Sequence, residues 1–173
     1  MGALAQVPEP VNTAASDFDA LYRDTAADVF AYAYSLLRDR AAAEDVTMAA
    51  FERAYRARHG FDPRRGTQRA WLFAIARNAA LDELRRRRRA APLIDEPPGE
   101  SAAAEEREPA QRATVRAALA ALEPRERELV ALKFFAGLSN TEIAVVLGTT
   151  ESNAGTRLHR VVVKLREACH APS

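Results

Sequence analysis

Residues 139–160 read SNTEIAVVLGTTESNAGTRLHR, and this stretch decides the fold of the C-terminal part of the chain. Ser139 and Glu142 have the spacing of a capping box, which opens a short helix, and Gly148 supplies its C-terminal stop. Thr150 can cap a second, longer helix directly after it. Two helices joined by so short a turn form a helix-turn-helix, a motif whose second helix enters the major groove of DNA.

The second helix of this motif, expected over about 151–168, has two unlike faces. At 100° per residue, an apolar set falls within a narrow arc that should pack inward: Ala154, Leu158, Val161 and Leu165. The opposite side presents mostly groups that read base edges or hold phosphates: Ser152, Thr156, His159, Arg160 and Val163. A basic face that merely meets solvent is the alternative, but the capped helix before it favours DNA binding.

Helical periodicity also organises the start of the chain. Residues 1–15 show no period and are expected to be disordered. The segment 16–19 has the form of a capping box, so the first helix should begin at Ser16. Its apolar pattern leaves open a break near Asp24 and Thr25.

Two further helices are expected in the first half of the chain. The first runs over about 41–58 and the second over about 68–88, where Thr67 can act as the cap. The basic segment 59–66 between them contains two glycines and a proline, so we expect it to be a loop.

The segment 90–109 has the composition of an extended linker, with four prolines and little bulky apolar content. It carries one arginine against six acids, whereas 38–89 carries fourteen arginines against seven acids and 110–173 nine basic against six acidic residues. Two basic blocks around an acidic one indicate two modules that face nucleic acid. We therefore expect an all-α protein with two small helical domains, 16–89 and 110–173, joined by an acidic flexible linker.

Two helices are expected between the linker and the helix-turn-helix. The first ends at Glu123, and Pro124 suits the first position of the next, which Gly137 should stop. Their apolar positions recur at helical spacing: Val115, Leu119, Leu122, Leu129, Leu132 and Phe135.

The composition excludes several kinds of site. Cys169 is the single cysteine, and the three histidines, His59, His159 and His170, are scattered, so no metal site is expected. We find no phosphate-cradling glycine loop and no nucleophile motif, so we expect no cofactor and no catalytic residue. No apolar run is long enough to span a membrane and no secretory signal is evident, which places the chain in the cytoplasm.

The predicted helix 68–88 carries a mixed polar and aromatic stripe within about 40°: Trp71, Asn78, Asp82, Arg85 and Arg89. Five consecutive arginines, 85–89, would repel one another unless phosphates or acidic surfaces neutralise them. A solvated helix end is the simpler interpretation, but the basic loop beside it favours a path for a DNA backbone. In that loop Phe61 could hold an unstacked base, whereas Trp71 more often belongs to a core.

These residues resemble the extracytoplasmic-function group of sigma factors, the smallest sigma factors, over about 17–89 and 112–168. In the first domain the resemblance rests on five clusters: AEDV at 43–46, Phe51 with AYR at 54–56, FDPR at 61–64, AWL at 70–72, and IARN at 75–78 through Asp82 and LR at 84–85. In the second it rests on LEPRER at 122–127, GLS at 137–139, EIA at 142–144, LG at 147–148 and TRLHR at 156–160.

The resemblance implies that core RNA polymerase, through its clamp and flap regions, and promoter DNA are the partners, and it allows for an anti-sigma factor. The implied polymerase contacts are Glu44, Asp45, Met48, Phe51, Glu52 and Tyr55. The implied readers of an opened minus-10 element are Phe61, Asp62, Arg64, Arg65, Arg77, Asn78, Asp82 and Arg85. The implied readers of a duplex minus-35 element are Ser152, Asn153, Thr156, Arg157, His159 and Arg160.

The chain departs from the family pattern at three positions. Met48 and Ala49 stand where the family usually has a glutamine and an acidic residue, and Gly155 replaces a basic residue that often contacts bases. Polymerase binding should therefore depend more on apolar contact and on Asp45. Two other classes remain as alternatives: a helix-turn-helix regulator that binds duplex DNA without polymerase, and, with little support, a helical enzyme.

Overall fold

The computed structural model describes residues 13–90 and 110–170. All described elements are helical: α1 (Thr13–Leu37), α2 (Arg40–Ala57), the short 3-10 helices η1 (Arg58–Gly60) and η2 (Pro63–Arg65), α3 (Gln68–Ala90), α4 (Ala110–Ala120), α5 (Pro124–Val130), the π-helical turn η3 (Ala131–Phe135), α6 (Asn140–Leu147) and α7 (Glu151–His170). The predicted disordered start and the predicted linker lie outside the described residues, apart from their edges. No described helix is long and apolar enough to cross a membrane.

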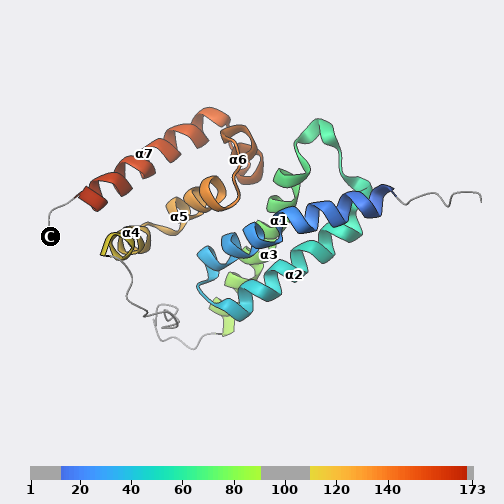
Figure 1. The fold of residues 1–173 in the computed structure, drawn as a ribbon, viewed down its shortest axis with the longest axis horizontal. Coiled ribbons are helices and arrows are strands. Elements are labelled where there is room, and N and C mark those ends of the chain that lie inside the picture. The colour runs from blue at the N-terminus through green and yellow to red at the C-terminus, as the bar shows by residue number, and fades with distance from the viewer. Residues whose placement is uncertain (1–12, 91–109, 171–173) are drawn as a thin grey trace, which may run out of the picture.

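The first three helices form one module, in which α1, α2 and α3 pack side by side (Figure 1). α1 begins at Thr13, three residues before the predicted start, and runs without a break through Asp24 and Thr25. Thr25 does not interrupt the helix because its hydroxyl donates back to the Leu21 carbonyl at 2.5 Å, which satisfies it within the helix itself.

The ends of α2 and α3 depend on short polar contacts. Thr67 caps α3, as predicted, by accepting a hydrogen bond from the Ala70 amide at 3.1 Å. Asp39, for which no cap was predicted, caps α2 by accepting a hydrogen bond from the Ala42 amide at 3.0 Å. Between these helices the chain makes η1 and η2, and Gly66 follows with φ of 143°, a conformation that a side chain would resist.

The second module contains α4 to α7, with α5 to α7 joined by the turns that the sequence predicts. Ser139 and Glu142 form the capping box of α6, Gly148 ends it in the left-handed conformation, and Thr150 accepts a hydrogen bond from the Asn153 amide at 3.2 Å. The helix that begins at Pro124 differs from the prediction, because it does not stay α-helical up to Gly137.

After Val130 that helix changes to the π-helical turn η3, in which the Ala136 amide donates to the Ala131 carbonyl at 3.0 Å. A π-helical turn accommodates one residue more than an α-helical turn, so the side chains beyond it are rotated. Leu132, within this turn, and Ala136, directly after it, both lie in the core.

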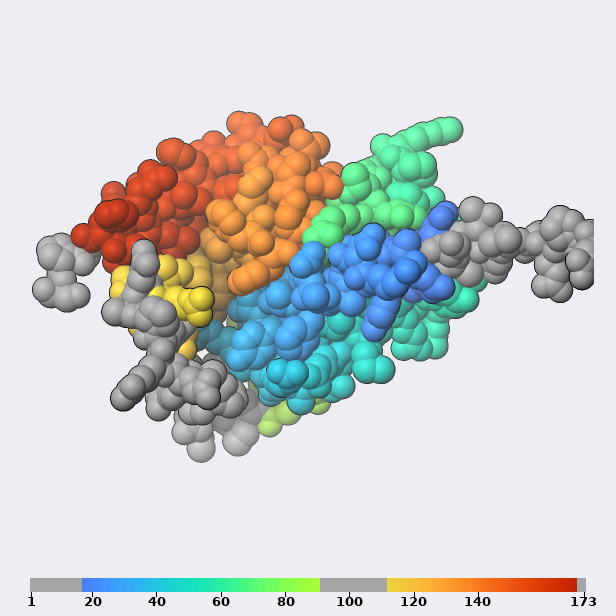
Figure 2. All heavy atoms as spheres, viewed as in Figure 1, coloured from blue at the N-terminus to red at the C-terminus, as the bar shows by residue number. Residues whose placement is uncertain are grey.

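The two modules pack directly against each other, which the sequence did not predict. α3 contacts α6, and α1 contacts α5 and η3 (Figure 1), so the two groups of helices form one continuous body in Figure 2. The largest apolar cluster takes Tyr32 and Phe73 from the first module and Leu129, Leu132 and Ile143 from the second. Burial of this apolar surface favours the closed arrangement.

Removal of Leu132 from this shared core should destabilise the whole chain. Leu132→Ala leaves a cavity at a fully buried site, and we expect the free energy of unfolding to fall by about 2–5 kcal/mol in urea denaturation. Val145→Ala is the control, because Val145 is exposed on α6, and its effect should stay within about 0.5 kcal/mol. Equal effects of the two substitutions would contradict the packing described.

Candidate nucleic-acid and polymerase interfaces

The α6–α7 pair presents a polar face on α7 that is free of protein cover. Ala154, Leu158 and Val161 are buried, as the periodicity predicts, and Leu165 packs partly buried against a small cluster with Leu122 and Val130. The predicted minus-35 readers all lie on the outer side: Ser152, Asn153, Thr156, His159 and Arg160 are exposed and Arg157 is half-buried. The geometry needed to enter a groove is therefore present.

Two residues near the start of α7 have local constraints. Asn153 donates through Nδ2 to the Thr149 hydroxyl at 2.7 Å, so its side chain already stabilises the turn. Gly155 lies against α6, where a Cβ atom would approach Asn140 Nδ2 at 3.4 Å. A larger residue there would begin in contact with α6.

The loop between α2 and α3 stands out from the three-helix body (Figure 1) and carries exposed Arg64 and Arg65. Phe61 leans on Trp71 with ring centroids 5.5 Å apart, and Trp71 packs partly buried against the core cluster. Asp62 accepts a hydrogen bond from the Arg64 amide at 3.0 Å, so its carboxylate shapes the η2 turn. The loop can thus offer two guanidinium groups beside a supported aromatic ring.

The polar residues of the predicted stripe on α3 are exposed, and two of them pair with each other. Asn78 and Arg85 are exposed, but Asp82 lies 3.3 Å from Arg85 and 3.6 Å from Arg53, which neutralises its charge locally. Arg77 is the largest correction. Its side chain is only 25% exposed and its Nε donates to Glu128 of α5 at 2.6 Å, so it is not available to DNA in this conformation.

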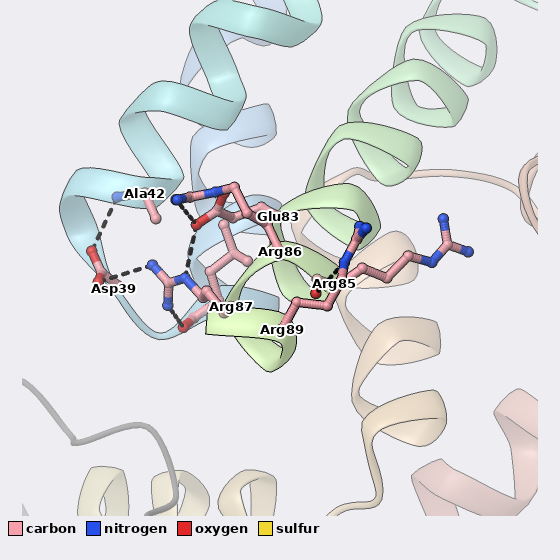
Figure 3. Close-up of polar contacts among 8 residues, drawn as sticks. Asp39, Ala42, Glu83, Arg85, Arg86, Arg87 and Arg89 are labelled. Carbon is pink, nitrogen blue, oxygen red and sulfur yellow. Dashed lines mark hydrogen bonds and ion pairs between the residues drawn. The ribbon is translucent and has the colours of Figure 1, made fainter. Parts of the chain in front are cut away.

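The arginine run is partly neutralised by the protein itself (Figure 3). Arg87 reaches the turn between α1 and α2, where it lies 2.9 Å from Asp39. Within α3, Arg87 also lies 2.9 Å from Glu83, and Arg86 makes two hydrogen bonds of 2.8 Å to Glu83. Figure 3 shows Arg85 and Arg89 extending to the other side of α3. The expected path for a DNA backbone is therefore limited to part of the run.

Ion pairs of this cluster hold its acids in the charged form. The Ala42 amide and the Arg87 guanidinium lower the pKa of Asp39, against the effect of desolvation. Hydrogen bonds from Arg86 and Arg87 likewise lower the pKa of Glu83. Both carboxylates therefore stay ionised at neutral pH; Asp39 ties the end of α3 to the start of α2 through Arg87, and Glu83 holds Arg86 and Arg87 within α3.

One face of α2 combines an exposed thioether with acidic groups. Met48 is 72% exposed, and Glu44, Asp45, Glu52 and Tyr55 are exposed around it. Phe51, which the resemblance placed in the polymerase contact, is only 5% exposed and packs against Tyr22 at 4.8 Å between ring centroids. It therefore belongs to the core and supports this face from beneath.

A second group of polar contacts joins the two modules, and sequence reasoning missed it. The Tyr32 hydroxyl donates to Glu128 at 3.3 Å beside the Arg77 contact. Arg69 donates to the Ala136 carbonyl at 2.6 Å and also pairs with Asp28. The sequence offers one signal of these contacts in Glu128. This acid directly precedes Leu129 and lies one turn before Leu132, two apolar positions of the same predicted helix.

Burial keeps Tyr32 protonated. Desolvation raises the pKa of Tyr32 well above its usual value, and the nearby Glu128 charge raises it further. The hydroxyl therefore remains a donor to Glu128 over the physiological pH range. At the other end of the interface the Thr67 hydroxyl donates to Glu142 at 2.5 Å, which connects the start of α3 to the capping box of α6.

Among residues 13–90 and 110–170, no group of three or more histidine, cysteine or acidic residues could hold a metal ion. The described surface instead offers a free helix-turn-helix face, a basic loop and an acidic face with an exposed methionine. This combination defines a DNA-binding transcription protein.

Comparison with known proteins narrows this class. Residues 21–90 match the model of sigma-70 region 2, and residues 112–165 match the model of sigma-70 region 4. The chain is 33% identical over 167 residues to the ECF RNA polymerase sigma factor SigL of Mycobacterium tuberculosis, with 94% of each chain covered. It is also 33% identical over 176 residues to SigE of Mycolicibacterium smegmatis, covering 92% of this chain and 68% of that protein.

Among solved structures, CnrH in complex with the cytosolic domain of CnrY is similar, with a TM-score of 0.66, 28% identity and coverage of 93% of this chain and 95% of that chain. The chain belongs to the extracytoplasmic-function sigma factors of the sigma-70 family. It is thus a sigma factor that directs promoter-specific transcription initiation, and the all-α fold with region 2 and region 4 modules is confirmed.

The exposed face of α7 leads to a prediction about salt dependence. If Arg160 holds a phosphate, Arg160→Ala should flatten the slope of log K against log salt for promoter duplex binding by about one unit, because one fewer counterion is released. The measurement is fluorescence anisotropy over a salt series. Arg166→Ala removes the same charge from another side of α7 and should leave the slope nearly unchanged; an unchanged slope for Arg160→Ala would contradict its role.

Proposed function

We propose that the outer face of α7 reads the minus-35 element as duplex DNA. The observation that supports this is the exposure of Ser152, Thr156, His159 and Arg160 on one side of a helix whose other side is buried. Hydroxyl and guanidinium groups near the start of a recognition helix can reach base edges, and Arg157 can add a phosphate contact. Asn153 contributes mainly to the turn.

We propose that the loop after α2 reads the opened minus-10 element. Phe61 would stack on or enclose an unpaired base while Arg64 and Arg65 hold the backbone, and Asp62 keeps the loop in shape. Asn78 and Arg85 on α3 are exposed and would extend this surface. Arg77 would join them only when its contact with Glu128 is broken, and Asp82 would act by orienting Arg85.

We propose that α2 binds the clamp of core RNA polymerase through a surface centred on Met48. Its neighbours Glu44, Asp45 and Glu52 would face basic groups, and Tyr55 would extend the apolar contact. Exposed apolar side chains in a charged rim are the usual make-up of a protein interface. Phe51 would support this surface from the core.

The structure of CnrH with the cytosolic domain of CnrY supports a proposal about a further partner. We infer that an anti-sigma protein can bind this chain, and that the chain acts in the cytoplasm as a non-catalytic subunit. The two predicted domains, 16–89 and 110–173, would act together on one promoter, with the segment between them as a connection.

Run-off transcription with purified core polymerase tests this function. The chain should start transcripts at sites in a cognate genomic library that core polymerase alone does not use. A helix-turn-helix regulator acting without polymerase would bind duplex DNA but would neither co-purify with core polymerase nor start transcripts.

The α2 surface gives the matching prediction. Met48→Asp should weaken binding to core polymerase roughly tenfold or more, because it places a charge in the centre of an apolar contact. Ala57→Asp adds the same charge to the same helix, but nine residues on and so on the opposite side, and should have little effect. Binding is measured by surface plasmon resonance. Unaltered affinity of Met48→Asp would place the polymerase contact elsewhere.

A further inference from the structure

Two polar contacts between the modules lie at or beside the proposed minus-10 surface. Arg77 donates to Glu128, and Thr67, at the end of the basic loop, donates to Glu142. Both acceptors belong to the second module. In the closed arrangement this edge of the surface is thus covered by carboxylates, the same type of anionic oxygen acceptor as a DNA phosphate.

Glu128 is the residue on which this closure depends most. Its side chain is 11% exposed, and it accepts hydrogen bonds from Arg77 and Tyr32, which both belong to the first module. A buried carboxylate is strongly unfavourable when its partners are removed, so Glu128 favours the closed state only while these two donors are in place. Each of the two modules supplies one half of a contact that neither can make alone.

The closed arrangement engages part of the proposed minus-10 surface but leaves the proposed minus-35 face of α7 open. It covers Arg77 and holds Thr67, but it leaves Ser152, Thr156 and Arg160 on α7 exposed. Closure therefore does not obstruct the outer face of the helix-turn-helix. It competes with nucleic acid only at the first module.

We propose that Glu128 is a conformational latch, which holds the modules closed and withholds Arg77 from single-stranded DNA while the duplex-reading face of α7 stays open. This inference rests on the proposed role of Arg77 at the minus-10 element. In the free chain, duplex binding is available at once, whereas the single-strand surface gains Arg77 and its full affinity only when the modules part. Any partner that separates the modules, or occupies Arg77, shifts this balance.

The latch predicts the behaviour of Glu128→Gln in the full-length chain. The substitution keeps the shape of the side chain but removes its charge, so the open state gains population. We expect a larger radius of gyration in small-angle X-ray scattering and roughly tenfold tighter binding of a short random-sequence single strand, because affinity scales with the open fraction. Affinity for a random-sequence duplex should stay the same.

Glu126→Gln is the matched control. It removes the same charge from α5, but Glu126 pairs with Lys164 of α7 at 2.8 Å, within the second module, and glutamine can preserve the capping box. Neither the radius nor the single-strand affinity should change. A second variant, Arg77→Glu with Glu128→Arg, restores an ion pair and should return the radius to that of the original chain, which a merely unfolded module would not do.

The outcomes separate the latch from the proposed function. If Glu128→Gln leaves both the radius and the single-strand affinity unchanged while the original chain is active in run-off transcription, the latch is wrong and the function stands. If the chain opens but Arg77→Ala in the Glu128→Gln background does not reverse the gain in affinity, Arg77 is not the residue withheld, and the latch as stated is overturned. If the original chain starts no transcripts, the proposed function fails, whatever the radius shows.

Discussion

The need to satisfy one buried carboxylate organises the centre of this protein. Glu128 lies next to the apolar residues that form the shared core, and its charge is tolerated there because Arg77 and Tyr32 donate to it from the other module. The apolar cluster supplies most of the attraction between the modules, but it is not directional. The hydrogen bonds to Glu128 select one relative orientation out of those that the apolar surfaces alone would allow.

Features that depend on nearby residues could be predicted from the sequence. The capping box at Ser139, the stop at Gly148 and the caps at Thr67 and Thr150 each involve groups within a few positions, so their residue types and spacing suffice. The inward arc of α7 was equally accessible, because helical periodicity alone assigns Ala154 and Leu158 to one side. Contacts between Arg77 and Glu128, 51 positions apart, leave no such local pattern.

Two errors in the candidate site have physical reasons. The resemblance implies a polymerase contact for Phe51 together with Met48 and Tyr55, but Phe51 lies 60° around the helix from Met48, enough to turn its ring into the core. The whole arginine run was predicted to follow a DNA backbone, because no nearby residue in the sequence reveals that Arg87 pairs with Asp39, 48 positions away. The roles of the remaining site residues stay predictions.

The π-helical turn at Ala131–Phe135 has a consequence for how this chain can vary in length. Such a turn is equivalent to a single-residue insertion absorbed without an interruption of the helix. Loss of one residue here would restore an ordinary helix, and the residues that follow would keep nearly the same direction, because the wide turn already absorbs the extra residue. Loss of a second residue, from what is then an ordinary helix, would turn the following part through about 100° and carry Glu142 away from Thr67 and Ala136 away from Arg69. At this point the chain can therefore lose one residue without a change of phase, whereas a further loss would break the contacts with the first module.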